Sequence, residues 1–249
     1  VSCTLRQLIP AGLTAHEFYA LIAELEDKGF VGIGFRRDAA YAIVSAASRD
    51  TPVPDELIDR MERWLIPCTA VDVTEVESDA KDRSSSVLWG QGPMVALPNG
   101  NYPTLSALTS ACLNVDPPRL DRWLSVLELH ATRAESPRVW CALFQHELTY
   151  LRMADRSRVE AFVDQVIAAA PSILAGQGWA YFVAHACRWA SVAAVRRWMM
   201  CIRGKAGEAR QEAGELACLR HAFFPAEDWS RELVEALSVD AASDAPLGV

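Results

Sequence analysis

Three pairs of Cys and His side chains are the residues of this chain best suited to hold a metal ion. In the 249-residue sequence they are Cys141 with His146, His185 with Cys187, and Cys218 with His221. Thiolate and imidazole groups bind zinc, and four of them would form a site. On a helix only residues three or four apart share a face, so Cys218 and His221 are our candidate metal ligands. Because no Cys-x-x-Cys spacing occurs, buried core thiols are the alternative, and we expect no cofactor.

A cluster of basic residues with two interleaved Trp residues is the second candidate site. Its members are Arg188, Trp189, Arg196, Arg197, Trp198, Arg203, Lys205 and Arg210. Such a patch could bind an acidic partner, a phosphate group or a single nucleic-acid strand. It could equally be a solvated helix face whose Trp rings point inward. The candidate partner-binding residues of this cluster are Arg196, Arg197, Arg203 and Lys205.

A loop rich in Gly and Pro carries one further candidate, Trp89, which Gly90 and Gly92 follow closely. A Trp residue on a loop between two structural units could anchor a partner protein. It could also be the side chain that packs the two units together. Both interpretations are open at this stage.

The sequence matches two known catalytic motifs only in part. His146-Glu147 begins like the helix of a zinc peptidase, but position 150 is Tyr, where the second His is required. Asp55, Asp79 and Lys81 only superficially match the acidic pattern of a metal-dependent nuclease. We therefore expect no intrinsic catalysis. The alternative is a metal-dependent hydrolase or nuclease whose active site is assembled from residues far apart in the sequence.

The elements of the first hundred residues predict a small α+β unit. Thr14-x-x-Glu17 is a capping box that begins a helix, and Gly29 ends it. A second helix is predicted from Asp55 to Ile66, before Pro67. Short apolar runs with β-branched and aromatic residues predict strands between these helices and after them. The expected strands are 30–35, 41–47, 71–76 and 94–97.

Amphipathic stretches follow one another from Pro118 to Ser238, with helix starts about every twenty residues. Ser136-Pro137 and the capping box Ser157-x-x-Glu160 mark two of these starts. No repeated residue signature accompanies them. The pattern resembles that of HEAT-like two-helix solenoids, and an irregular helical bundle would produce it too.

The expected fold is therefore mainly α, with a small N-terminal α+β unit followed by a HEAT-like or irregular antiparallel helical stack. The expected domains are 1–100 for the α+β unit and 101–240 for the helical part. Residues 241–249 are expected to be a disordered tail, because the chain from Asp240 is rich in Ala, Ser and Asp and lies at the terminus.

The net charge and the cysteine pattern limit which partners and which cellular compartment are expected. The net charge is −8, from 24 basic and 32 acidic residues. That balance disfavours a general nucleic-acid binder and suits a basic protein partner. Seven scattered Cys residues favour reduced thiols, hence the cytoplasm, and no apolar stretch is long enough to span a membrane. The preference for Arg over Lys, with much Ala, indicates a bacterial gene.

In general character the chain is similar to immunity proteins of bacterial toxin systems and to helical sensor regions of bacterial antiviral assemblies. That resemblance implies a protein–protein interaction module, acting as an adaptor, a regulator or an immunity-type protein. An immunity protein would use carboxylates to cover a basic cleft of its toxin. The oligomeric state is left open.

Overall fold

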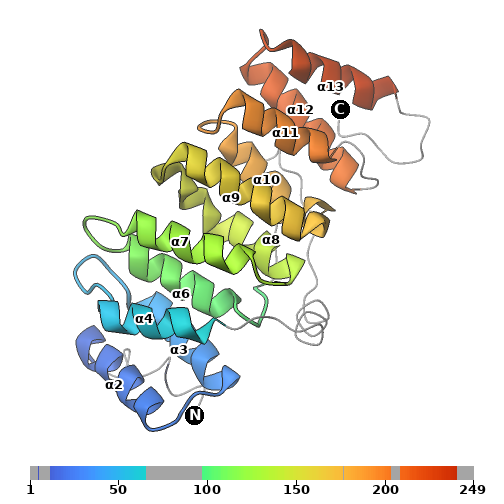
Figure 1. The fold of residues 1–249 in the computed structure, drawn as a ribbon. Coiled ribbons are helices and arrows are strands. Elements are labelled where there is room, and N and C mark those ends of the chain that lie inside the picture. Colours follow the sequence, from blue (N-terminus) through green and yellow to red (C-terminus); the bar gives the residue numbers. More distant parts are fainter. Residues whose placement is uncertain (1–4, 6–11, 66–96, 176, 203–207, 240–249) are drawn as a thin grey trace. The chain divides into compact units, whose positions relative to one another are not determined.

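The computed structural model describes residues 5, 12–65, 97–175, 177–202 and 208–239, and these residues form helices without any strand. The described residues up to Glu135, except Leu97, form a first compact unit. Leu97 and the described residues from Ser136 onwards form a second. None of the helices in these ranges is long and apolar enough to cross a membrane. The helices of the first unit are α2 (Ala15–Asp27), α3 (Ile33–Ala46), α4 (Asp55–Trp64), α6 (Tyr102–Leu113) and α7 (Leu120–Ala131) (Figure 1). Those of the second are α8 (Pro137–His146), η1 (Leu148–Met153), α9 (Arg156–Ala169), η2 (Pro171–Ala175), α10 (Gln177–Ala186), α11 (Val192–Ile202), α12 (Glu208–Phe223) and α13 (Asp228–Val239).

Helix α6 is the centre of the first unit. It packs against α3, α4 and α7, and α2 packs against α3 and α4. Nine of its twelve residues are buried, including Tyr102, Leu105, Leu108 and Cys112. A helix that is apolar on nearly every side is stable only when neighbours surround it, and α3, α4 and α7 are those neighbours.

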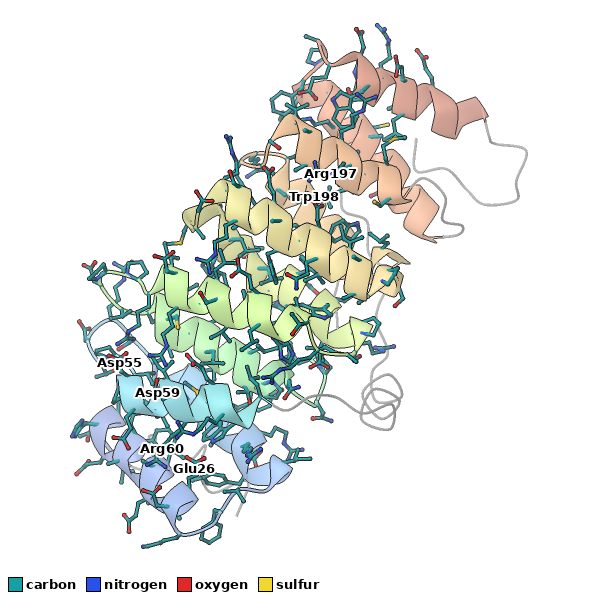
Figure 2. The ribbon with its side chains drawn as sticks, in the orientation of Figure 1. Glu26, Asp55, Asp59, Arg60, Arg197 and Trp198 are labelled. Atoms are coloured by element: carbon teal, nitrogen blue, oxygen red, sulfur yellow. The ribbon has the colours of Figure 1, made fainter. Side chains whose placement is uncertain are left out.

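Polar bridges join α4 to α2 on one side and to α7 on the other. The Glu26 carboxylate of α2 accepts hydrogen bonds from Trp64 Nε1 at 2.7 Å and from Arg60 at 2.9 Å, both on α4. Figure 2 labels Glu26 and Arg60. On α7, Arg122 Nε donates to Glu62 of α4 at 2.7 Å. Each bridge satisfies a donor that packing of the helices removes from water, so it fixes how the helices align.

In the second unit, α10 packs against both α8 and α12, and α12 also packs against α11 and α13. The centre of this unit is aromatic. The Phe144 ring of α8 lies 5.4 Å from Trp179 and 4.8 Å from Phe182 of α10, between ring centroids. The Trp198 ring of α11 lies 6.3 Å from Trp179 and 5.8 Å from Phe182. These four rings, all fully buried, hold α8, α10 and α11 together.

Helices α8 and α10 approach each other closely at Gly178. A Cβ atom placed there would lie 2.0 Å from the carbonyl oxygen of Cys141 and 2.8 Å from its carbonyl carbon. Both are backbone atoms of α8, which cannot move without moving the helix. Only glycine therefore allows α10 to approach α8 this closely.

The predicted α+β character of the first unit is wrong for the described residues. The expected strands 30–35 and 41–47 are replaced by α3, which begins at Ile33 and includes the expected turn at 36–38. Alanine forms helix more readily than any other residue, and Ala39, Ala40, Ala42 and Ile43 make a buried helical face here. The expected strand 71–76 lies outside the described residues, as do most of 94–97 and the predicted tail 241–249. Leu97, the one described residue of 94–97, is not in a strand.

Substituting Gly178 by Ala should destabilise the protein by about 3 kcal/mol, because the new methyl group overlaps the α8 backbone. The matched control is Gly34→Ala, also in a helix, where a Cβ atom would meet nothing within 4 Å. That control should stabilise the fold by roughly 0.5–1 kcal/mol, since alanine loses less backbone entropy. Urea unfolding followed by circular dichroism measures both. Equal effects of the two substitutions would contradict the close approach of α8 and α10.

Candidate functional site

A groove of about 940 Å³ lies on the second unit, between α9, α11 and α13. It combines exposed apolar side chains with two arginines of the predicted basic cluster. Its lining residues are Asp164 and Ile167 of α9, Val192, Ala193, Arg196, Arg197, Met200 and Cys201 of α11, and Trp229 of α13.

The floor of the groove is one face of α11. Val192, Arg196 and Met200 follow one another at four-residue spacing, and this stripe runs about 12 Å along the helix. Val192 is 47% exposed and Met200 is 40% exposed. The opposite face of α11 is buried in the core and consists of Ala194, Val195, Trp198 and Met199. The same helical period that buries Trp198 therefore turns Arg196 and Met200 towards solvent.

Two carboxylates of α9 align that helix with α11. Glu160 accepts hydrogen bonds from the backbone N–H of Ser191 at 2.7 Å and from its Oγ at 2.9 Å. One turn further, Asp164 accepts from Trp198 Nε1 at 2.8 Å and from Arg197 Nη2 at 2.6 Å. Figure 2 labels Arg197 and Trp198. Because Asp164 pairs with both, its charge is satisfied and Arg197 is held against the α9 wall of the groove.

The wall contributed by α13 is built on a buried arginine. Arg220 of α12 is nearly inaccessible and donates to Glu227 at 2.6 and 2.8 Å and to the Cys187 carbonyl at 2.8 Å. Its guanidinium lies 3.8 Å from the Phe224 ring centroid and 6.0 Å from that of Trp229. These contacts fix the corner between α12 and α13, and thereby the position of Trp229.

Arg196 is the cation of the groove that is left for a ligand. It is exposed, and in the described part of the chain no acidic side chain pairs with it. Its neighbour Arg197 is bound to Asp164. The groove thus presents one available positive charge between two exposed apolar side chains, Val192 and Met200.

The structure brings two of the five candidate partner-binding residues together. Arg196 and Arg197 both line the groove. Trp89, Arg203 and Lys205 lie outside the described residues. Within the basic cluster, Trp198 is fully buried and faces the core, whereas Trp189 is half-buried and packs against Phe182 with ring centroids 6.1 Å apart. Stacking of a nucleic-acid base on Trp198 is therefore excluded by its burial.

The candidate metal ligands Cys218 and His221 lie one turn apart on α12, and both are half-buried. The His221 Nδ1 atom is 3.5 Å from Ser230 Oγ. Burial raises the pKa of the Cys218 thiol, which disfavours the thiolate that binds metal. Across the described ranges, no three His, Cys, Asp or Glu side chains gather closely enough to hold a metal ion. Metal binding by this pair stays a prediction.

Sequence reasoning missed Met200, Val192, Asp164 and Trp229 as parts of the site. One signal was present. The dipeptide Arg-Trp occurs four times, at 63–64, 122–123, 188–189 and 197–198. In three of them the Trp ring is buried and its N–H donates to a neighbouring helix, the acceptors being Glu26, Thr109 and Asp164. This recurrence marks where adjacent helices are bridged.

No protein-family model matches this chain, and neither a curated protein nor a solved structure is detectably similar to it.

The Trp198–Asp164 hydrogen bond should contribute measurably to stability. Trp198→Phe removes the indole N–H and leaves Asp164 with Arg197 alone. The control is Trp179→Phe, because that ring is equally buried and its N–H has no acceptor in the described part of the chain. We expect Trp198→Phe to lower the free energy of unfolding by about 1–2 kcal/mol more than the control. Equal losses in urea unfolding would mean that this bond stabilises nothing.

Cys201 should report on the groove by chemical labelling. It is exposed in the groove, whereas Cys112 is buried in α6, where burial raises the pKa of the thiol to about 11. A higher pKa means less reactive thiolate at pH 8, so iodoacetamide should modify Cys201 faster than Cys112 by at least about tenfold. Peptide mass spectrometry over time measures both rates. Rapid modification of Cys112 in the folded protein would contradict the packing of α6.

Proposed function

We propose that this chain is a protein–protein interaction module without catalysis of its own, and that a partner segment docks in the groove of the second unit. The observation that carries the proposal is the groove floor, where the exposed apolar side chains Val192 and Met200 flank the available charge of Arg196. Exposed apolar surface with a polar rim is typical of interaction sites.

The framing of the groove supports this proposal. Asp164 and Glu160 hold α9 to α11, and Arg220 with Glu227 holds the corner that carries Trp229. A surface that is already ordered loses little conformational entropy when a partner binds, so more of the contact energy remains as affinity.

The helical architecture supports it as well. Within the second unit α10 packs against α8 and α12, and α12 packs against α11 and α13. HEAT-like solenoids also stack successive helices, and they expose long binding surfaces. We therefore keep the role of adaptor, regulator or immunity-type protein of a bacterial system, in the cytoplasm, as the proposed setting. No observation in the described residues favours the alternative of a metal-dependent hydrolase or nuclease.

The net charge of the chain and the charge at the groove favour partners of opposite sign. The net charge of −8 favours a basic partner overall. In the first unit, however, acidic side chains of α4 are already paired, as Glu62 is with Arg122 and Asp55 with Arg119. At the groove, the available charge is positive. A partner that docks there is favoured when its docking segment is acidic.

Selection of random 16-residue peptides displayed on phage, with the full chain as bait, tests the proposal. We expect enriched peptides to lose at least about tenfold in affinity for Met200→Glu, because a charge replaces the exposed apolar contact. The matched control is Met153→Glu, since Met153 on η1 is 46% exposed and does not line the groove. Binding by titration calorimetry that is indifferent to Met200→Glu, or selection that enriches no binder, would overturn the proposed docking site.

A further inference from the structure

We infer that the segment recognised in the groove is an amphipathic helix with an acidic residue between two apolar residues, each four positions away. This inference rests on the proposed function and names the class of ligand for the same site. Two observations carry it. One is the order of side chains along α11, and the other is that Arg197 is paired with Asp164 whereas Arg196 has no acidic partner in the described residues.

The order of side chains sets the spacing of the ligand. Val192, Arg196 and Met200 are four residues apart, so successive members of the stripe are separated by about 6 Å along the helix axis. A partner helix that lies along α11 repeats its own side chains with the same rise at four-residue spacing. Its acidic residue therefore faces Arg196, and its two apolar residues face Val192 and Met200. This holds whether the partner helix runs parallel or antiparallel to α11.

The charges along the groove select an acidic residue for the middle position. Arg197 and Trp198 both donate to Asp164, so the carboxylate of Asp164 is already neutralised by the protein. Arg196 has no acidic partner in the part of the chain that the structure describes. A carboxylate of the ligand gains an ion pair with Arg196, whereas a lysine at the same position meets the guanidinium of Arg196 and is repelled.

The backbone of the groove explains why the ligand is a helix and not an extended peptide. The floor and both walls belong to helices, whose backbone N–H and C=O groups are bonded within each helix. An extended peptide would find no exposed strand edge there with which to pair. A helical segment satisfies its own backbone and brings only side chains to the groove.

Three synthetic peptides test the inference, with the full chain and with fluorescence anisotropy as the measure of affinity. Each is a 20-residue helix, stapled on the face away from the groove, that carries Leu-x-x-x-Glu-x-x-x-Leu or the same sequence with Gln or Lys in place of Glu. We expect the Glu peptide to bind about tenfold more tightly than the Lys peptide, with the Gln peptide between them. The preference should weaken as salt is added, because the pair is partly exposed.

Charge reversal in the protein should reverse the preference. With Arg196→Glu, the Lys peptide should bind more tightly than the Glu peptide. A loss of folding would weaken the binding of both peptides and could not reverse their order. The matched control is Arg156→Glu, an exposed arginine of α9 that does not line the groove, and it should leave the order unchanged. The Glu peptide should also slow alkylation of Cys201 in the wild-type protein.

The outcomes separate this inference from the proposed function. Equal binding of the Glu and Lys peptides, or an order that Arg196→Glu does not change, overturns the acidic ligand. A variant of the Glu peptide in which proline breaks the helix, but which binds as tightly, overturns the helical ligand. In both cases phage-selected binders that respond to Met200→Glu would leave the groove as a docking site. If those binders are indifferent to Met200→Glu, the docking site itself is overturned.

Discussion

A carboxylate that accepts hydrogen bonds from both an indole and a guanidinium group joins neighbouring helices in each of the two units. Glu26 does so for Trp64 and Arg60, and Asp164 does so for Trp198 and Arg197. The described α-helices of this chain have 10 to 16 residues, too short to be stable alone, so they depend on packing. Burying a Trp ring supplies much of that packing, but its N–H then needs an acceptor. The carboxylate on the adjacent helix provides it, and thereby sets the alignment of the two helices.

The same interaction determines what the groove can recognise. Because Asp164 pairs with Arg197, the charge of that arginine is already compensated, and the Trp198 ring beside it is buried in the core. Arg196, the preceding residue, takes no part in this bridge and remains available. The specificity of the site therefore follows from an interaction whose first role is to hold α9 and α11 together. An acidic ligand would bind beside a carboxylate that the protein has already neutralised.

Local signals predicted much of the helical structure. The capping box of Thr14 and Glu17 begins α2, and Ser136 with Pro137 begins α8. The predicted capping box at Ser157 is wrong, since Asp155 caps α9 instead and accepts from the backbone N–H of Arg158. The strands expected at 30–35 and 41–47 were also wrong. Short apolar runs look alike in strands and helices, and α3 forms because its Ala-rich face is buried within the first unit.

By itself, the sequence determined the helical period of the second half, several helix starts and the position of the basic cluster. These depend on residues within one or two turns of each other, and such short-range spacing is visible in a linear chain. Only the tertiary structure decided that Arg197 is bound while Arg196 is available, and that Trp229 forms a wall of the same groove. The partners concerned lie about thirty residues apart on different helices, and the alignment of those helices depends on which buried donor meets which acceptor across the interface.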